Sequence, residues 1–267
     1  MLRFISLGSG SSGNCYVLYT ENDALLIDVG VGTRMLKKRL REAGLSMNDI
    51  TAVLVTHDHA DHVKSVGTVS RDFLLPVYTT HKVHEGIERN YCVRHKIGAE
   101  RTMEIKKNEW IEIGSFRVMP FDVPHDSADN VGYRIEAEGV TFCMMTDVGH
   151  VTDRMKEMIG EADYLVIEAN YDEEMLMAGP YPEHLKTRIS SPLGHMSNKV
   201  CGGVIAENAT ERLKHVWLCH LSEENNHPEL ARKTVEQVLR SYGIVAGKDF
   251  LLDVLKRTTP SEIFELK

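Results

Sequence analysis

The sequence predicts an α/β fold in which two mixed β-sheets pack face to face and helices cover their outer faces. The chain has 267 residues, of which 42% are hydrophobic and 26% are charged, so it can bury the core of a single domain spanning 1–267. Short β-branched and aliphatic runs recur with turn residues between them. Segments with amphipathic helical spacing are interspersed among these runs, as expected for packed layers.

The predicted strands come in hairpin-like groups and make the first half of the chain strand-rich. Each is a short run of β-branched and aliphatic side chains. They lie at 2–7, 15–20, 24–28, 51–55, 110–121, 131–137, 140–145, 163–168, 214–220 and 249–254.

The predicted helices have one apolar and one polar face. The first ends at a glycine, which suits a helix C-cap, and the last has Pro228 in its first turn. The stretch 170–196 is rich in Gly and Pro and is predicted to form a surface loop or insertion. The helices lie at 32–44, 80–90, 151–160, 197–208 and 228–242.

Composition argues against several classes of protein. A net charge of −8 disfavours a broadly basic, DNA-coating surface but leaves room for a local basic groove. Five cysteines without a CxxC pair disfavour a disulfide scaffold or a zinc-thiolate finger and favour a reducing compartment. Without a signal-peptide pattern or a run of 18 apolar residues, the expected protein is cytoplasmic and does not enter a membrane.

The segment THDHADH, residues 56–62, holds the densest group of metal-ligating residue types. Because His57 and His59 lie two apart in extended backbone after an apolar strand, they face the same side. Asp61 and His62 follow where the chain turns into a helix. Two imidazoles at the strand end suit one borderline metal, and a carboxylate with a further imidazole suits a second beside it. The spacing predicts a dinuclear centre rather than a merely polar turn.

The remaining ligands must come from other strand ends. His125 in VPHDS, Asp147 in MMTDVG and His220 in WLCHLS each stand at such a position. Asp28 also ends an apolar run, and we expect it to orient a ligand imidazole through its free N–H. The expected cofactor is two divalent metal ions, with zinc, manganese and iron all suited to this donor set. The predicted ligands are His57, His59 and His125 for one metal, Asp61, His62 and His220 for the other, and Asp147 as the bridge.

These motifs resemble the metallo-β-lactamase fold superfamily. The HxHxDH pattern at 57–62, followed in order by the later His, Asp and His, carries this resemblance. A closer similarity, to the YycJ/WalJ group of bacterial metallohydrolases, rests on LGSGSSGNCY, THDHADH, PHDS, TDVG, EANYD, GHMSN and HLSEENN. The resemblance implies an αββα sandwich and a 5′-to-3′ DNA exonuclease with a role in mismatch repair.

Two further residues bear on the reaction. Two adjacent metals lower the pKa of a bridging water and neutralise charge on the atom under attack, so we expect a hydrolase in which Asp61 is also catalytic. Glu168 closes a predicted strand, and His195 stands at a predicted helix start that favours an anion. By resemblance to the superfamily's nucleases, Glu168 orients His195, which contacts the phosphate or acts as general acid. The structural alternative is that Glu168 satisfies backbone amides and His195 caps a helix.

Substrate contacts are expected on two segments. The glycine-serine loop at 8–14 lacks the ending of a P-loop and is first a tight turn, but it can also edge the active site. Polar and basic side chains around His195 can line a groove for phosphates. The predicted substrate-binding residues are Ser9, Ser11, Asn14, Arg188, Ser197, Asn198 and Lys199.

The leading hypothesis is a phosphodiesterase that acts on nucleic acid, with DNA ends as the expected substrate. Residues 148–194 are too few for the large insert of the RNA-processing relatives, which favours a free single-stranded end. The alternative is a hydrolase of small esters, thioesters or lactams, of glyoxalase II or β-lactamase type. It fits the acidic net charge better but has no need of Glu168 and His195. A regulatory protein with a structural metal centre is disfavoured by the complete ligand set.

Overall fold

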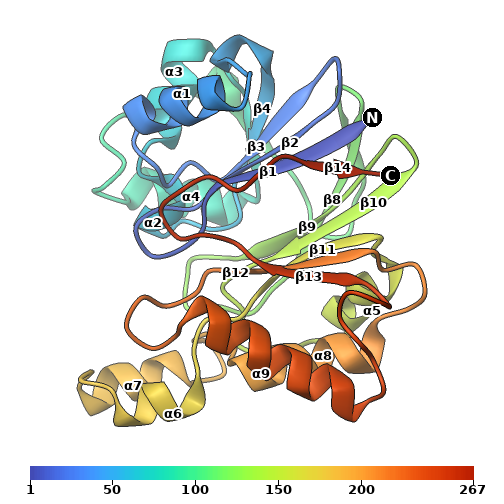
Figure 1. The fold of residues 1–267 in the computed structure, drawn as a ribbon. Helices are drawn as coiled ribbons and strands as arrows, with labels where there is room; N and C mark the ends of the chain where they lie inside the picture. The colour runs from blue at the N-terminus through green and yellow to red at the C-terminus, as the bar shows by residue number, and fades with distance from the viewer.

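The computed structural model describes residues 1–267 as two seven-stranded mixed β-sheets packed face to face (Figure 1). The strand order of the first sheet is β14-β1-β2-β3-β4-β5-β6, and that of the second is β13-β12-β11-β10-β9-β8-β7. The first sheet contains β1 (Leu2–Gly8), β2 (Cys15–Tyr19), β3 (Ala24–Ile27), β4 (Ile50–Leu54), β5 (Val77–Thr79), β6 (Thr102–Glu104) and β14 (Phe264–Leu266). The second contains β7 (Ile111–Ile113), β8 (Phe116–Asp122), β9 (Val131–Ala137), β10 (Val140–Met145), β11 (Tyr164–Glu168), β12 (His215–Cys219) and β13 (Leu251–Val254).

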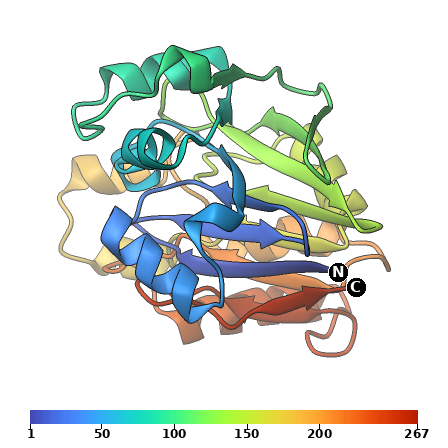
Figure 2. The same ribbon diagram turned by 90° about the horizontal axis from the view of Figure 1, so that it is seen from above.

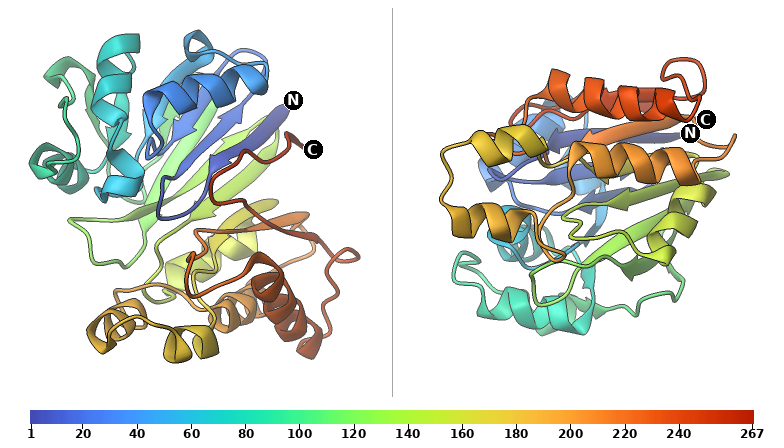
Figure 3. Two further views of the ribbon diagram at one scale, coloured as in Figure 1. Left: turned by 60° about the vertical axis from the view of Figure 1, so that its left-hand side comes forward. Right: turned by 90° about the horizontal axis from the view of Figure 1, so that it is seen from below.

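Helices cover the outer face of each sheet, which confirms the predicted αββα sandwich. Figure 2 shows the two termini side by side, where β1 pairs antiparallel with β14. Figure 3 shows α6 and α7 beyond the ends of α8 and α9. The helices of the first sheet are α1 (Thr33–Glu42), α2 (Ala60–Val63), α3 (Val66–Phe73) and α4 (His81–Arg89), and those of the second half are α5 (Asp153–Glu161), α6 (Glu173–Ala178), α7 (Glu183–Ile189), α8 (Asn198–Asn208) and α9 (Pro228–Ser241).

Three apolar layers hold the sandwich together. Between the sheets, the ring of Phe4 lies 5.2 Å from that of Phe142 and 5.0 Å from that of Trp217, measured between ring centroids. A second cluster joins the first sheet to α1, α3 and α4, and a third joins the second sheet to α5, α8 and α9. Because strand side chains alternate between faces, each central strand contributes to two of these layers.

The structure differs from the prediction where elements are short. The strands β5, β6 and β14 have three residues each, too few to show a period of two, and they were not predicted. The predicted strand 110–121 is a hairpin, with Gly114 at φ 55° in its turn. The predicted loop 170–196 contains α6 and α7, and α3 is a further helix outside the predicted ranges, whereas the turn into a helix expected at Asp61 and His62 is α2.

None of the helices combines the length and the apolar character that a membrane span requires. All five cysteines are free.

Candidate metal centre

Three strands end in the same unusual backbone conformation. Asp28 follows β3 at φ 60°, Asp147 follows β10 at φ 57° and His220 follows β12 at φ 52°. Residues other than glycine seldom adopt this left-handed region, and it persists where surrounding contacts fix it. The strand pairs β3–β4, β10–β11 and β11–β12 are parallel, so their carboxyl ends lie at common edges. Side chains from these ends form one buried cluster.

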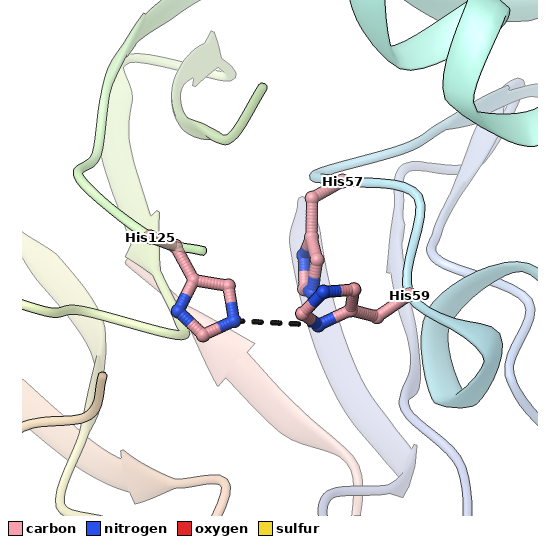
Figure 4. A group of neighbouring side chains, drawn as sticks. All are labelled: His57, His59 and His125. Carbon is pink, nitrogen blue, oxygen red and sulfur yellow. Dashed lines mark hydrogen bonds between the residues drawn. The ribbon is translucent and has the colours of Figure 1, made fainter. Parts of the chain in front are cut away.

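The first triad consists of His57, His59 and His125, whose rings surround a common point (Figure 4). Nε2 of His125 lies 3.3 Å from Nδ1 of His59. The other nitrogen of each ring is held by an oxygen. His57 Nδ1 lies 3.1 Å from the Thr56 hydroxyl, His59 Nε2 lies 3.2 Å from the carbonyl of Asp126, and His125 Nδ1 lies 2.9 Å from the carbonyl of Gly194.

The second triad consists of Asp61, His62 and His220. Asp61 Oδ2 lies 3.5 Å from His62 Nε2 and 3.4 Å from His220 Nε2. The other ring nitrogen of each histidine contacts a carboxylate. His62 Nδ1 lies 2.7 Å from Asp28 Oδ2, and His220 Nδ1 lies 2.8 Å from Glu168 Oε1. Asp28 therefore lies where the predicted orienting role requires it.

Asp147 lies between the two triads. Its Oδ1 is 3.6 Å from His125 Nε2, and its Oδ2 is 3.3 Å from His62 Nε2. Only 2% of the residue is exposed. The structure thus brings together all seven predicted ligands, and a carboxylate faces both groups as a bridging ligand would.

The electrostatic environment of the imidazoles differs between the triads. Burial lowers the pKa of His57 well below its ordinary value, with a further lowering from His62, and burial also lowers the pKa of His125. Burial acts in the same direction on His62, but the carboxylates of Asp28, Asp147 and Asp61 raise its pKa to about 10. Burial also acts to lower the pKa of His220, but Asp147, Asp61 and Glu168 together raise it well above the ordinary value.

The donor atoms fit a divalent metal. His57 Nε2 and His220 Nε2 are buried, and neither has a hydrogen-bond partner within the chain. A buried polar atom without a partner is costly, and a cation bound to it removes that cost. Imidazoles combined with carboxylates suit zinc, manganese and iron. The orphaned nitrogens and the converging carboxylates together fit a divalent metal centre.

Glu168 is buried, and both of its oxygens are fully engaged. Oε2 accepts hydrogen bonds from the backbone N–H groups of Val148 at 2.9 Å and Met196 at 3.0 Å. Oε1 lies 3.0 Å from His195 Nδ1 as well as next to His220. Burial would raise the pKa of Glu168, but His195 and His220 hold it at about 2. The two interpretations of Glu168 are compatible, because it satisfies backbone amides and also holds His195.

His195 lies at the edge of the cluster rather than inside it. Its ring centroid is 5.1 Å from that of His125 and 5.4 Å from that of His220. About a sixth of the side chain is exposed, and Nδ1 is the ring nitrogen that contacts Glu168. Burial lowers its pKa, but Glu168 and Asp147 raise it above the ordinary value. The ring is therefore fixed on one side and leaves Nε2 for an external group.

Four of the predicted substrate-binding residues are buried, and their polar atoms are engaged within the chain. Ser9 Oγ accepts a hydrogen bond from the His220 backbone N–H at 2.9 Å, and Asn14 Nδ2 lies 2.8 Å from His62 Nε2. Ser197 caps α8 by accepting a hydrogen bond from the N–H of Val200. Asn198 pairs with Asn226 at 3.0 Å. Asn14 thus contacts the second triad directly, since its Nδ2 also lies 3.2 Å from Asp61 Oδ2, whereas Ser197 and Asn198 form contacts within the fold around α8.

The other three predicted substrate-binding residues lie at the surface. Ser11 is exposed in the glycine-serine loop. Arg188 Nε donates to Asp126 Oδ2 at 2.6 Å, next to His125 of the first triad. Lys199 pairs with Glu173 at 3.1 Å. Arg188 is thus beside the metal-ligating residues, whereas Lys199 is committed to an ion pair with the start of α6.

Sequence reasoning missed two residues that contact the candidate ligands. Thr56 donates from Oγ1 to Asp28 at 2.9 Å and lies next to His57 Nδ1. Asp126 Oδ1 is buried without a hydrogen-bond partner, 3.4 Å from His125 Nε2. Both lie directly beside a predicted ligand in sequence, and that adjacency was the available signal.

Comparisons with known proteins extend these findings. The family model of the beta-lactamase superfamily domain matches residues 24–216. The chain is 36% identical over 265 residues to exodeoxyribonuclease YycJ of Bacillus anthracis, covering 98% of each protein. It is 34% identical over 249 residues to exodeoxyribonuclease WalJ of Streptococcus pneumoniae, covering 93% of this chain and 92% of that protein.

A solved structure shares the fold. The metallo-beta-lactamase fold protein YhfI from Bacillus subtilis matches with a TM-score of 0.73 at 17% identity, covering 99% of this chain and 100% of that one. This likeness concerns the fold alone.

Proposed function

The chain belongs to the metallo-β-lactamase superfamily, with YycJ and WalJ as relatives over nearly its full length, and we propose from this premise that it is a metal-dependent exodeoxyribonuclease. The observation that carries the proposal is the position of His195. A phosphodiesterase needs a group that can bind a phosphate or protonate a leaving oxygen, and His195 stands at the edge of the ligand cluster with Nδ1 fixed by Glu168.

We assign one divalent cation to the first triad and one to the second, with the carboxylate of Asp147 shared between them. Zinc, manganese and iron are the metals that suit these ligands. When bound, such cations lower the pKa of a water molecule and neutralise charge on the phosphate.

Residues of the chain are assigned to orient the water, bind the phosphate and transfer protons. Glu168 accepts a hydrogen bond from the Nδ1–H of His195, so the second proton of a charged ring lies on Nε2, toward the substrate. From Nε2 that proton passes to the leaving oxygen or binds a phosphate oxygen. Asp61, with 24% of its side chain exposed, is assigned to orient the attacking water and accept its proton. His62 and His220 beside it are buried.

Digestion of end-labelled oligonucleotides by metal-loaded protein tests the proposal. The wild type is expected to shorten DNA, and His195→Ala is expected to be slower by about a hundredfold or more, the usual share of a general acid. Nitrocefin and a lactoyl thioester serve as comparison substrates. Hydrolysis of either compound without digestion of DNA would contradict the proposal and favour a small-molecule hydrolase.

We further propose that digestion runs from 5′ to 3′ and serves mismatch repair. DNA labelled separately at each end tests the polarity, because a 5′-to-3′ enzyme releases a 5′ label first. Early release of a 3′ label would contradict it. Loss of mismatch repair in cells that carry His195→Ala, restored by the wild type, would support the cellular role.

A further inference from the structure

An aromatic side chain stands fully in solvent near the metal-ligating residues. Tyr91, in the segment 90–96 after α4, is 92% exposed, the largest exposed fraction among the large hydrophobic side chains of the chain. An exposed aromatic ring beside an active site is a common means of holding an unstacked base. Whether Tyr91 can do this depends on how firmly it is held and on what surrounds it.

The segment 90–96 is fastened to the structure on both sides of Tyr91. Asn90 Nδ2 donates to the carbonyl of Asp58, between the ligands His57 and His59, at 2.7 Å, and Asn90 Oδ1 accepts from the N–H of Cys92 at 2.9 Å. Lys96 Nζ donates to the carbonyl of Asn90 at 2.8 Å. The Tyr91 backbone is therefore ordered before any ligand arrives, which reduces the entropy cost of binding.

Tyr91 lies between two cavities. One, of about 330 Å³, is lined by His59 of the first triad together with Asp58, Arg89 and Tyr91. The other, of about 590 Å³, is lined by Lys64, Arg94, His95 and Tyr91. Because Tyr91 and Cys92 line both, the two cavities are adjacent, and together they make a surface that runs from His59 past Tyr91 to Lys64 and Arg94. We call it the Tyr91 groove.

The far half of the Tyr91 groove is positively charged, although the chain as a whole is acidic. Lys64 and Arg94 form no salt bridge, and Lys64 Nζ donates only to the carbonyl of Ser12, at 2.8 Å. No carboxylate lines that half. In the near half, Arg89 is paired with Glu85 at 2.8 Å, and Asp58 Oδ1 accepts the N–H of Ala128 at 3.0 Å. Two unpaired cations in a hollow create a local attraction for phosphates.

We propose that the Tyr91 groove binds single-stranded DNA and leads its end to the metal centre, with a base stacked on Tyr91 and phosphates held by Lys64 and Arg94. This inference rests on the proposed nuclease function. A stacking ring needs a base that is free of its duplex neighbours, so the groove favours a single strand over a duplex.

Fluorescence anisotropy with metal-loaded protein and a phosphorothioate oligothymidylate that resists hydrolysis tests the groove. Tyr91→Ala is expected to raise Kd between about fivefold and a hundredfold, the range for loss of one stacked base. Lys64→Gln and Arg94→Gln should each lower the salt dependence of log Kd by about 0.7, as for one phosphate contact on a single strand. Tyr242→Ala, at a tyrosine that is 53% exposed beyond α9, is the matched control and should bind like the wild type.

The binding measurements distinguish the proposal for the Tyr91 groove from the proposed nuclease function. If Tyr91→Ala and Lys64→Gln bind DNA with wild-type affinity, the proposal that the Tyr91 groove binds DNA is wrong. The nuclease proposal still holds in that case, provided that the wild type digests DNA. Equal affinity for duplex and single strand, equally weakened by Tyr91→Ala, would overturn the assignment to a single strand. Melting temperatures like that of the wild type establish that the variants fold.

Discussion

The two triads differ in the groups that contact the outer ring nitrogen of each histidine, the one that points away from the candidate metal site. In the first triad, uncharged oxygens support the rings, namely the Thr56 hydroxyl and the carbonyls of Asp126 and Gly194. In the second, the carboxylates of Asp28 and Glu168 do so. A carboxylate behind an imidazole makes the ring a more basic ligand and fixes its orientation. The comparison teaches that two adjacent sites built from similar ligands need not hold a metal equally well, and that side-chain substitutions should affect the second site more.

The largest effect is expected from Asp147→Ala, because this carboxylate faces both triads. Loss of a ligand shared by both sites removes several kcal/mol of charge stabilisation, so digestion should fall by about a thousandfold or more. Elemental analysis should show fewer than two metals per chain. Digestion within tenfold of the wild type would show that the triads act independently of Asp147.

A smaller effect is expected from Glu168→Gln, which weakens the support of His220 and also releases His195. Metal affinity at the second triad should fall by about tenfold to a hundredfold. Since His195 also loses its partner, kcat should remain low even when the metal is saturating. Full recovery of kcat at high metal concentration would contradict the role of Glu168 toward His195.

Asp28→Asn isolates the effect on metal binding. Asp28 contacts His62 directly and does not contact His195, so the expected loss is about tenfold to a hundredfold in metal affinity at the second triad. A smaller loss is expected at the first triad, which Asp28 reaches only through the Thr56 hydroxyl. In contrast with Glu168→Gln, excess metal should restore kcat. A metal titration followed by digestion measures both quantities. If Asp28→Asn weakens metal binding at the first triad instead of the second, the claim that carboxylates support the second triad is wrong.

The smallest effect is expected from Thr56→Val, which removes the one side-chain support of the first triad. A neutral hydrogen bond contributes about 1 kcal/mol, so metal affinity at the first triad should fall by less than about tenfold. The main-chain carbonyls behind His59 and His125 stay in place. A loss as large as that in Asp28→Asn, measured by the same titration, would show that uncharged and charged supports are equivalent.

The sequence predicted the sandwich and the place of the metal residues because both depend on local patterns. His57 to His62 follow one apolar run, and Asp147 and His220 each end another, so parallel strands bring them to the same edge. Short elements such as β5 and α6 escaped prediction because a few residues carry no clear periodicity.

Burial could not be predicted for polar residues near the site. Ser9 and Asn198 have the residue types of substrate contacts, but the fold buries both and pairs their polar atoms with His220 and Asn226, which neither residue type nor spacing reveals. The contact between the Asn90 side chain and the Asp58 carbonyl spans 32 positions and depends on how α4 packs, which a single sequence does not reveal.

Metal analysis of the folded protein, coupled to digestion of end-labelled single-stranded DNA before and after chelation, tests the central claim most directly. We predict two divalent cations per chain, loss of digestion when they are removed and its return when metal is added back. A folded chain that binds no metal, or one that digests DNA equally well after chelation, would contradict the assignment of these seven side chains as a catalytic metal centre.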